Sequence, residues 1–337
     1  MVRTKIIATL GPASNNTRVI RKMMDKGLDI VRLNFSHGTH ETHIKAIKLI
    51  RTLNAKRRRK IMIMQDLEGF RIRVGKVSAP VKLVHGKPFC FYKKNVLGNE
   101  KGISLDYSGL FSSIKKGSLL YIDDGRLIFE VRKSGDRLLE TVIVTGGILN
   151  SHKGVNMPDV NLKFPSLTEK DKNDLIVALN YKVDYIAQSF VRSAADVNAL
   201  RKFMESKVSN IEIFAKVENK QAIANIDSII DAADGIMVAR GDLGVCLPIY
   251  KVPVLQKAII KRCNAKNKPV IVATQMMESM ITQSMPTRAE VSDVANAILD
   301  GASHVLLSAE TAVGIKPERV VDMMNKVIKY TEKHIDG

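Results

Sequence analysis

The segment IEIFAKVEN (211–219) is apolar enough to be buried, yet a lysine and a glutamate of opposite charge stand near its end. The segment alternates as a β-strand does, so Lys216 and Glu218, two positions apart, lie on one side of it. An ammonium group beside a carboxylate suits a site that binds a metal ion and an anionic substrate together. A polar residue at any single strand end is more often a solvated side chain, so the pair needs support from its neighbours.

Polar residues also lie at the C-terminal ends of most of the other predicted strands. Strand by strand they are Arg32, Asn34, Ser36 and His37; Asp66, with Arg71 and Arg73 beyond it; Arg240, Gly241 and Asp242; Thr274 and Gln275; and Ser308 and Glu310. Glu218 and Asp242 come from neighbouring strands, and two unpaired carboxylates would repel each other unless a divalent cation lay between them. Mg²⁺ fits because it prefers one or two carboxylates together with water and substrate oxygens.

Positive charge is expected around this metal site. Lys216, Arg32 and Arg73 would suit a phosphorylated substrate, because phosphoryl transfer depends mainly on positioning and charge neutralisation. The glycines of ARGDLG (239–244) predict a turn whose backbone N–H groups hold a carboxylate or phosphate. They could equally be simple turn formers.

Eight apolar segments, alternating with helical patterns, must position these residues. The predicted strands are 5–10, 29–35, 61–67, 183–190, 211–219, 235–240, 269–275 and 304–310. They are apolar on both faces, which is typical of parallel strands covered by helices, and Thr168 with Asp171 resembles a capping box. Eight strand–helix units predict an α/β fold, the (β/α)8 TIM barrel, whose chemistry sits at the C-terminal strand ends.

One interval has no convincing helix. From about Gly75 to Met157, short β-like runs alternate with glycine-rich turns. We therefore predict an all-β lid domain at 75–157, inserted after the third strand, and a barrel domain made of 1–74 and 158–337.

The net charge of the chain indicates which kinds of molecule it is expected to bind. The 53 Lys and Arg outnumber the 34 Asp and Glu, giving a net charge of +19 that attracts anions. Trp is absent and aromatic residues make up 5% of the chain, so nucleic acid is not the expected partner. No apolar run reaches the roughly 20 residues of a membrane span. Three cysteines without paired or metal-ligand spacing suit a reducing cytoplasm.

Over nearly its whole length the sequence resembles the pyruvate kinase family. The matching segments, in order, are KIIATLGPAS, VRLNFSHG, IDDG, KGVNMP, AKVEN, MVARGDLGV, ATQMMESM, PTRAEVSDVANAILDGA and LLSAETAVG. The resemblance implies a barrel with an inserted β-domain. It also implies phosphoryl transfer from phosphoenolpyruvate to ADP, giving pyruvate and ATP in the last step of glycolysis, with Mg²⁺ as the cofactor and Mn²⁺ as a possible substitute.

The resemblance implies a role for each matching residue. Glu218 and Asp242 would bind the metal ion, and Lys216 would neutralise charge on the phosphoryl group and the enolate. Thr274 would be associated with proton delivery to the enolate. The phosphate contacts would be Arg32 and Arg73. The substrate carboxylate would meet the backbone of Ala239, Arg240, Gly241 and Asp242. The nucleotide contacts would be His37, Arg73 and Lys153.

The sequence departs from many members of the family at the site of a monovalent cation. Those members hold K⁺ with Asn, Ser, Asp and Thr ligands, of which Asn34, Ser36 and Asp66 are present here. Leu67 removes a hydroxyl ligand, and Arg71 stands where those members have a carboxylate. We therefore expect a K⁺-independent enzyme in which the Arg71 guanidinium takes the place of the ion.

The sequence ends at Gly337, where the barrel would end. Most relatives continue into a C-terminal α/β effector domain, so we expect that domain to be absent. Assembly would then depend on barrel contacts, with PTRAEVSD (286–293) as the candidate segment and a homodimer as the preferred state.

Two alternatives stay open. A Mg²⁺-dependent barrel lyase acting on pyruvate-like enolates would share the metal ligands and an arginine, but it would not need a lid that carries Lys153. A non-catalytic, basic binding protein would fit the charge of +19. It would not explain the presence of Lys216, Glu218, Asp242 and Thr274.

Overall fold

The computed structural model describes residues 3–160, 164–205 and 210–335. Contacts between residues divide the chain into two compact units. The barrel unit comprises Met1–Gly69, Ser166–Leu243 and Tyr250–Gly337, and the second unit comprises Phe70–Pro165 and Gly244–Ile249. No helix within the described ranges has both the length and the apolar character that crossing a membrane requires.

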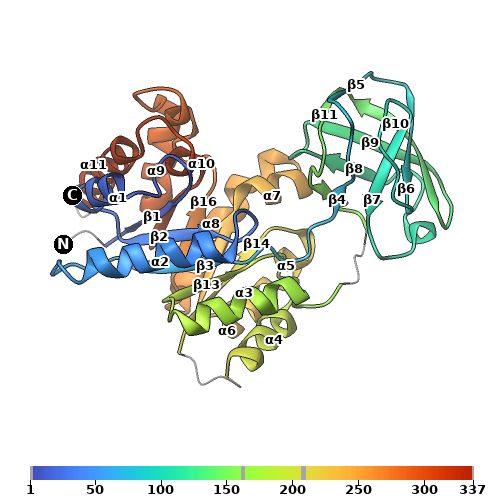
Figure 1. Cartoon of the computed structure of the whole chain (residues 1–337). Helices are drawn as coiled ribbons and strands as arrows, with labels where there is room; N and C mark the ends of the chain where they lie inside the picture. The colour runs from blue at the N-terminus through green and yellow to red at the C-terminus, as the bar shows by residue number, and fades with distance from the viewer. Residues whose placement is uncertain (1–2, 161–163, 206–209, 336–337) are drawn as a thin grey trace. The chain divides into compact units, whose positions relative to one another are not determined.

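The barrel unit is a closed cylinder of eight parallel strands (Figure 1). Around the cylinder they are β1 (Lys5–Thr9), β2 (Ile30–Asn34), β3 (Met62–Asp66), β13 (Tyr185–Gln188), β14 (Glu212–Val217), β15 (Gly235–Ala239), β16 (Val270–Ala273) and β17 (His304–Leu307), which closes on β1. Each lies within a segment predicted from the apolar pattern. The predicted fold class, a TIM barrel with an inserted all-β domain after the third strand, is confirmed.

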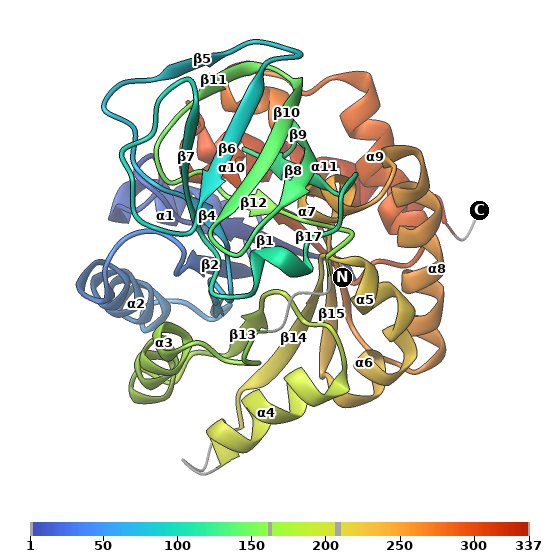
Figure 2. The same ribbon diagram turned by 90° about the vertical axis from the view of Figure 1, so that its right-hand side faces the viewer.

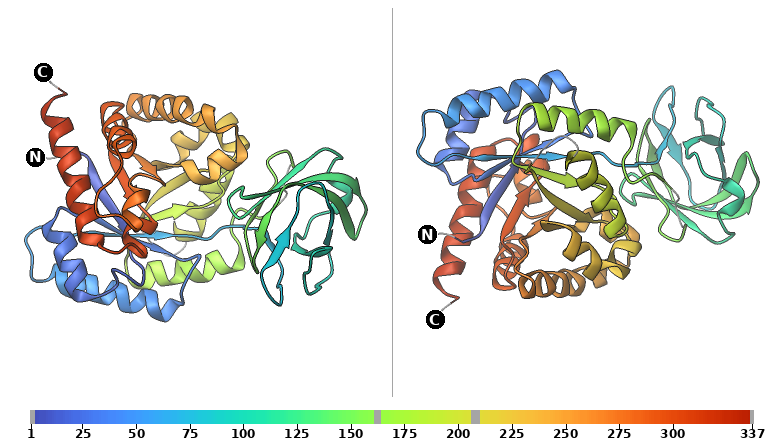
Figure 3. Two further views of the ribbon diagram at one scale, coloured as in Figure 1. Left: turned by 90° about the horizontal axis from the view of Figure 1, so that it is seen from above. Right: turned by 90° about the horizontal axis from the view of Figure 1, so that it is seen from below.

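Helices follow the strands of this cylinder along the chain, and the longer ones lie around it in three further views (Figures 2 and 3). They are α1 (Thr17–Asp25), α2 (His40–Asn54), α3 (Glu169–Asn180), α4 (Ala194–Glu205), α5 (Lys220–Ala224), α6 (Ile226–Ala232), α7 (Arg240–Cys246), α8 (Val252–Ala265), α9 (Arg288–Leu299), α10 (Ala309–Ala312) and α11 (Pro317–Lys333), with 3-10 turns at Ile249–Lys251 and Glu278–Ile281. The predicted capping box of Thr168 and Asp171 begins α3, and Thr287 with Glu290 forms another that begins α9.

The inside of the barrel is packed with side chains from alternate positions of the strands. Large residues such as Tyr185, Phe214 and Met237 meet small ones such as Ala187 and Ala273. Phe214 lies directly against Gly235, where an added Cβ would come within 2.3 Å of the phenyl ring. The glycine is therefore required by close packing between β14 and β15.

Polar side chains at the N-terminal ends of the strands satisfy backbone groups of the neighbouring strand. Asp29, just before β2, accepts a hydrogen bond from Ile6 N in β1 at 2.8 Å. Asp184, before β13, accepts one from Ile63 N at 2.8 Å, and Asp234, before β15, accepts one from Ile213 N at 2.8 Å. Ser303 Oγ does the same for Val270 N at 2.8 Å. Such a contact is found before every second strand. It fixes the register of neighbouring strands at the N-terminal end of the barrel.

The second unit is built from β-strands. Its seven-stranded sheet has the order β12 (Val155–Asn156), β8 (Leu119–Ile122), β9 (Leu127–Ser134), β10 (Leu138–Thr145), β6 (Pro88–Tyr92), β7 (Gly102–Asp106) and β4 (Arg73–Val74), and β11 (Gly147–Leu149) pairs with β5 (Val81–Leu83). A short 3-10 turn spans Phe111–Ser113. Phe89, Phe91 and Phe129 form the centre of its core, with ring centroids 5.0 to 5.2 Å apart.

Candidate active site

A buried ammonium group lies among acidic side chains at the C-terminal end of the barrel. Lys216 Nζ is 3.0 Å from Glu218 Oε1 and 3.1 Å from Asp66 Oδ1, and it donates to Ser189 Oγ at 2.7 Å. The lysine side chain is only 11% exposed and both carboxylates are 1% exposed. The alternation of β14 thus brings Lys216 and Glu218 together, as the sequence predicted.

Asp66 joins this lysine to a second cation. Its Oδ2 atom accepts a hydrogen bond from Arg32 Nε at 2.6 Å, while Arg32 Nη1 donates to Thr9 Oγ1 at 2.9 Å. Burial by itself would raise the pKa of Asp66, but the charges of Lys216 and Arg32 and their hydrogen bonds lower that pKa below its ordinary value. Asp66 is therefore ionised at neutral pH and holds both cations in place.

The same balance keeps Lys216 protonated. Burial would lower the pKa of its ammonium group, but the charges of Asp66, Glu218 and, more weakly, Asp242 outweigh burial and the repulsion from Arg32, so the pKa is raised. The lysine is thus a fixed positive charge at neutral pH.

Glu218 and Asp242 are suited to hold a divalent cation. Glu218 Oε2 accepts a hydrogen bond from Phe190 N at 2.7 Å, which fixes the orientation of its carboxylate. The charge of Asp242 acts on the same ammonium group. Glu218 and Asp242 thus offer the one or two carboxylates that Mg²⁺ prefers in proteins. In the described ranges no group of three or more His, Cys, Asp and Glu is placed to hold a metal ion, so water and substrate oxygens would complete the shell.

Thr274 and Gln275 follow β16 in an uncommon backbone conformation. Their φ angles are 70° and 55°, in the left-handed region that β-branched residues rarely adopt. Thr274 Oγ1 donates to Ala273 O at 2.6 Å and accepts from Gly241 N at 2.8 Å. The hydroxyl group is thereby placed beside the end of β15.

The segment Ala239–Gly244 is not the glycine-rich turn that the sequence suggested. β15 runs directly into α7, so Arg240, Gly241 and Asp242 form the first turn of a helix. The N–H of Gly241 is already taken by Thr274. The Arg240 guanidinium binds Thr274 O at 2.6 Å and pairs with Asp293 at 2.7 Å.

Asn34, Ser36 and His37 lie at the end of β2. Asn34 Oδ1 accepts from Ser36 N at 3.1 Å, and His37 O contacts His43 Nε2 at 2.8 Å. A cavity of about 580 Å³ in the barrel unit is bordered by Asn34, His37 and His43. The predicted nucleotide contact at His37 therefore borders a space large enough for a small organic ligand.

The remaining predicted ligand contacts belong to the second unit. There Lys153 Nζ is 2.8 Å from Asp123 Oδ1, Arg71 Nη2 is 3.4 Å from Asp124 Oδ1, and Arg73 Nη1 donates to His152 O at 3.1 Å. The roles of Arg71, Arg73 and Lys153 toward ligands stay predictions.

Sequence reasoning missed Ser189 and Phe190. Ser189 Oγ donates to Leu67 O at 2.6 Å and accepts from Lys216, and Phe190, with a φ of 54°, directs its N–H to Glu218. Ser189 is a polar residue at the end of a predicted strand, and this position could have identified it as a candidate site residue. The left-handed conformation of Phe190 had no signal in the sequence.

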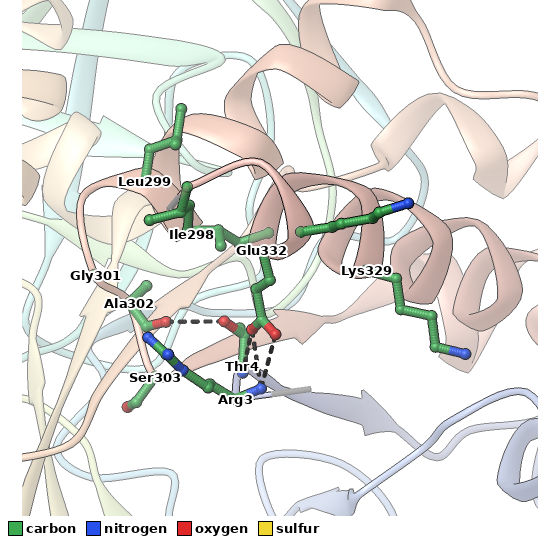
Figure 4. A pocket seen from close by; sticks show the side chains of 11 residues that line it. Arg3, Thr4, Ile298, Leu299, Gly301, Ala302, Ser303, Lys329 and Glu332 are labelled. Atoms are coloured by element: carbon green, nitrogen blue, oxygen red, sulfur yellow. Dashed lines mark hydrogen bonds between the residues drawn. The ribbon is translucent and has the colours of Figure 1, made fainter. Parts of the chain in front are cut away.

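A second cavity, of about 600 Å³, lies at the other end of the barrel, where β1 and β17 begin (Figure 4). Glu332 on α11 is part of its wall and accepts hydrogen bonds from Thr4 N at 2.6 Å and Arg3 N at 2.8 Å. These contacts tie the first described residues to the last helix. The cavity contains none of the predicted site residues.

The family model described as pyruvate kinase, barrel domain, matches residues 1–321. Pyruvate kinase of Thermococcus litoralis is 44% identical over 333 residues, covering 98% of this chain and 70% of the relative. Pyruvate kinase of Geobacillus stearothermophilus is 42% identical over 340 residues, covering 99% of this chain and 58% of the relative.

The fold has a counterpart of known structure. The crystal structure of a pyruvate kinase from Cryptosporidium parvum matches with a TM-score of 0.95 and 40% identity, covering 99% of this chain and 70% of that one. This chain thus spans between 58% and 70% of the length of these three proteins. Since the family model matches most of the chain, the chain belongs to the pyruvate kinase family.

Proposed function

We propose that this chain transfers the phosphoryl group of phosphoenolpyruvate to ADP, giving pyruvate and ATP. Family membership supports the reaction class, and one observation of the site carries the proposal. The buried Lys216 ammonium lies within 3.1 Å of two carboxylates and shares Asp66 with Arg32, so that two fixed cations and the Glu218 carboxylate are held together at the C-terminal end of the barrel.

In this proposal Lys216 acts as an electrostatic group and not as a base. Its raised pKa keeps it protonated, so it can stabilise negative charge on the migrating phosphoryl group and on the enolate that remains. Arg32, held by Asp66 and Thr9, adds a second fixed cation for the phosphate. Because hydrogen bonds orient both groups in advance, little reorganisation is needed during transfer.

Glu218 and Asp242 would hold Mg²⁺, or Mn²⁺ in its place, and the ion would neutralise charge between substrate and phosphoryl oxygens. The buried carboxylate of Glu218, fixed by Phe190 N, fits this role. Thr274 Oγ1 would then deliver a proton to the enolate, directly or through water. The substrate carboxylate would lie at the start of α7, and His37 would contact the nucleotide.

A coupled assay of pyruvate formation with phosphoenolpyruvate, ADP and Mg²⁺ tests the proposal. We expect turnover by the wild-type chain, and we expect Lys216→Met to lower kcat by about three orders of magnitude, the size of a strong charge-stabilising contact. Lys45→Met is the matched control, because Lys45 makes only an exposed pair with Glu41 on α2.

Lys216→Met leaves the buried Glu218 carboxylate without its cation and Asp66 with Arg32 alone, so near-UV circular dichroism must show that the variant is folded. A folded variant with near-normal kcat would remove Lys216 from its role. A wild-type chain without turnover would overturn the function and favour the binding-protein alternative, whereas turnover of an enolate substrate without ADP would favour the lyase. The homodimer and the cytoplasmic location stay predictions.

A further inference from the structure

Thr274 and Gln275 keep their left-handed backbone only because their surroundings impose it. Arg240 supplies much of that constraint. Its Nη2 atom donates to Thr274 O at 2.6 Å, and its Nε atom lies 3.2 Å from Thr274 O and 3.3 Å from Ala273 O. One guanidinium group thus holds two consecutive carbonyl groups around the residue that carries the hydroxyl.

The opposite edge of this guanidinium is fixed by α9. Arg240 Nη1 lies 2.7 Å from Asp293 Oδ2 and 2.8 Å from Oδ1, while Gln256 Oε1 is a more distant acceptor at 3.4 Å. The arginine side chain is 12% exposed and the aspartate side chain 35% exposed. Asp293 is therefore the charged group that holds Arg240 against the Thr274 turn.

The Thr274 hydroxyl depends on this arrangement. This hydroxyl group donates to Ala273 O and accepts from Gly241 N. Arg240 contacts the Ala273 carbonyl group and directly precedes Gly241 in the chain. A shift of the guanidinium would move the hydroxyl group. The contacts of Lys216 with Asp66, Glu218 and Ser189 do not involve Asp293 and would be kept.

We propose that Asp293 is a positioning residue for proton transfer, acting through Arg240 on the Thr274 hydroxyl; this inference rests on the proposed function. In that step the methylene carbon of the enolate forms a C–H bond with the proton of the Thr274 O–H group, directly or through a water molecule. The O–H bond breaks, and solvent returns a proton to the oxygen. Asp293 itself touches no reacting atom.

Exchange of the pyruvate methyl protons with D₂O isolates this step. It is followed by NMR with the full chain, pyruvate, Mg²⁺ and inorganic phosphate, which occupies the phosphoryl position. We expect Asp293→Ala to slow exchange by about tenfold or more, the cost of misplacing a reacting group, and to change the KM for phosphoenolpyruvate by less than about threefold. Asp293→Asn, which keeps an oxygen for Arg240, should slow exchange less.

Asp227→Ala is the matched control, because Asp227 pairs with Arg262 at 3.1 Å on the exposed outside of the barrel. Normal exchange in Asp293→Ala would overturn the inference. So would a parallel loss of exchange, KM and thermal midpoint in both Asp293 variants, because that pattern indicates a general structural role. A wild-type chain with neither pyruvate formation nor exchange would overturn the proposed function, and this inference with it.

Discussion

At the residue scale, the site depends on charges that compensate one another inside the protein. Asp66 would be costly to bury alone, and so would Lys216. Together with Arg32 and Glu218 they form a chain of contacts in which each group has a partner of opposite charge within 3.1 Å. Removing Lys216 would leave the buried Glu218 without a partner of opposite charge, while Asp66 would keep Arg32, so substitutions here affect folding and catalysis together.

Leu67 supports the prediction that K⁺ is not required. It follows Asp66 directly, is buried, and has no side-chain oxygen to offer a cation. Both oxygens of Asp66 are already bonded to Lys216 and Arg32, which further limits its use as an ion ligand. We expect replacement of K⁺ by a bulky organic cation to change kcat less than about threefold in the coupled assay, since a single missing cation contact would cost far more. Activation by K⁺ of tenfold or more would contradict this.

The sequence predicted single residues best where a strand fixes their direction. Lys216 and Glu218 lie two positions apart on a strand, so their meeting follows from the alternation of side chains. The partners Ser189 and Asp293 lie far away in the chain, and only the closed barrel shows which side chains they meet. The hydrogen bond from Phe190 N to Glu218 depends on the left-handed φ angle of Phe190, and a phenylalanine gives no indication of that conformation in the sequence.

At the element scale, the long helices could be predicted because caps and apolar periodicity mark them. Thr168 caps α3 as the sequence indicated, and Thr287 and Pro317 likewise mark the starts of α9 and α11. The short helices α5, α6, α7 and α10 have between four and seven residues, too few for a periodic pattern. Helix α7 was mistaken for a turn because of its glycines.

The aspartates before β2, β13 and β15 stabilise the barrel from the end opposite the proposed site. Asp234 accepts from Ile213 N at 2.8 Å and pairs with Arg201 at 3.0 Å. Asp234→Ala would leave the N–H of a buried residue without its acceptor, which costs about 1–3 kcal/mol of unfolding free energy. Equilibrium urea unfolding measures the loss, with Asp227→Ala as the exposed control. If the two variants were equally stable, the aspartate contacts would not stabilise the N-terminal end of the barrel.

At the scale of the whole molecule, the count of strand–helix units was enough to predict a closed barrel. Eight units rather than five or six distinguish it from an open sheet. The all-β interval was visible as a loss of helical periodicity, because glycine-rich turns separate its short strands. Its internal sheet order, β12-β8-β9-β10-β6-β7-β4, was not predictable, because pairing between distant short strands leaves no local pattern.

His304 makes the stability of the barrel depend on pH. It begins β17, is 5% exposed, and packs edge-on against Phe214 in the barrel interior. Burial, with the charge of Lys5, lowers its pKa from 6.5 to about 3. The folded protein therefore keeps His304 neutral while the unfolded chain accepts a proton as the pH falls below the ordinary value. Stability is full above about pH 6.5 and is lost progressively toward pH 3, by about 2 kcal/mol at pH 5 from this residue.

Urea unfolding at a series of pH values, for the wild type and for His304→Gln, measures this contribution. Glutamine does not titrate but keeps a polar group for Ser303, whose hydroxyl lies 2.8 Å from His304 Nδ1. We expect the variant to lose about 2 kcal/mol less than the wild type between neutral pH and pH 5, even if its stability at neutral pH is lower. Asp66 does not produce this difference. Its pKa in the folded protein is lowered from 3.8, so protonation of Asp66 destabilises the folded protein only below about that pH. If both proteins lost stability in parallel over this range, His304 would take up its proton without unfolding, and the barrel interior would have to admit a charge beside Phe214.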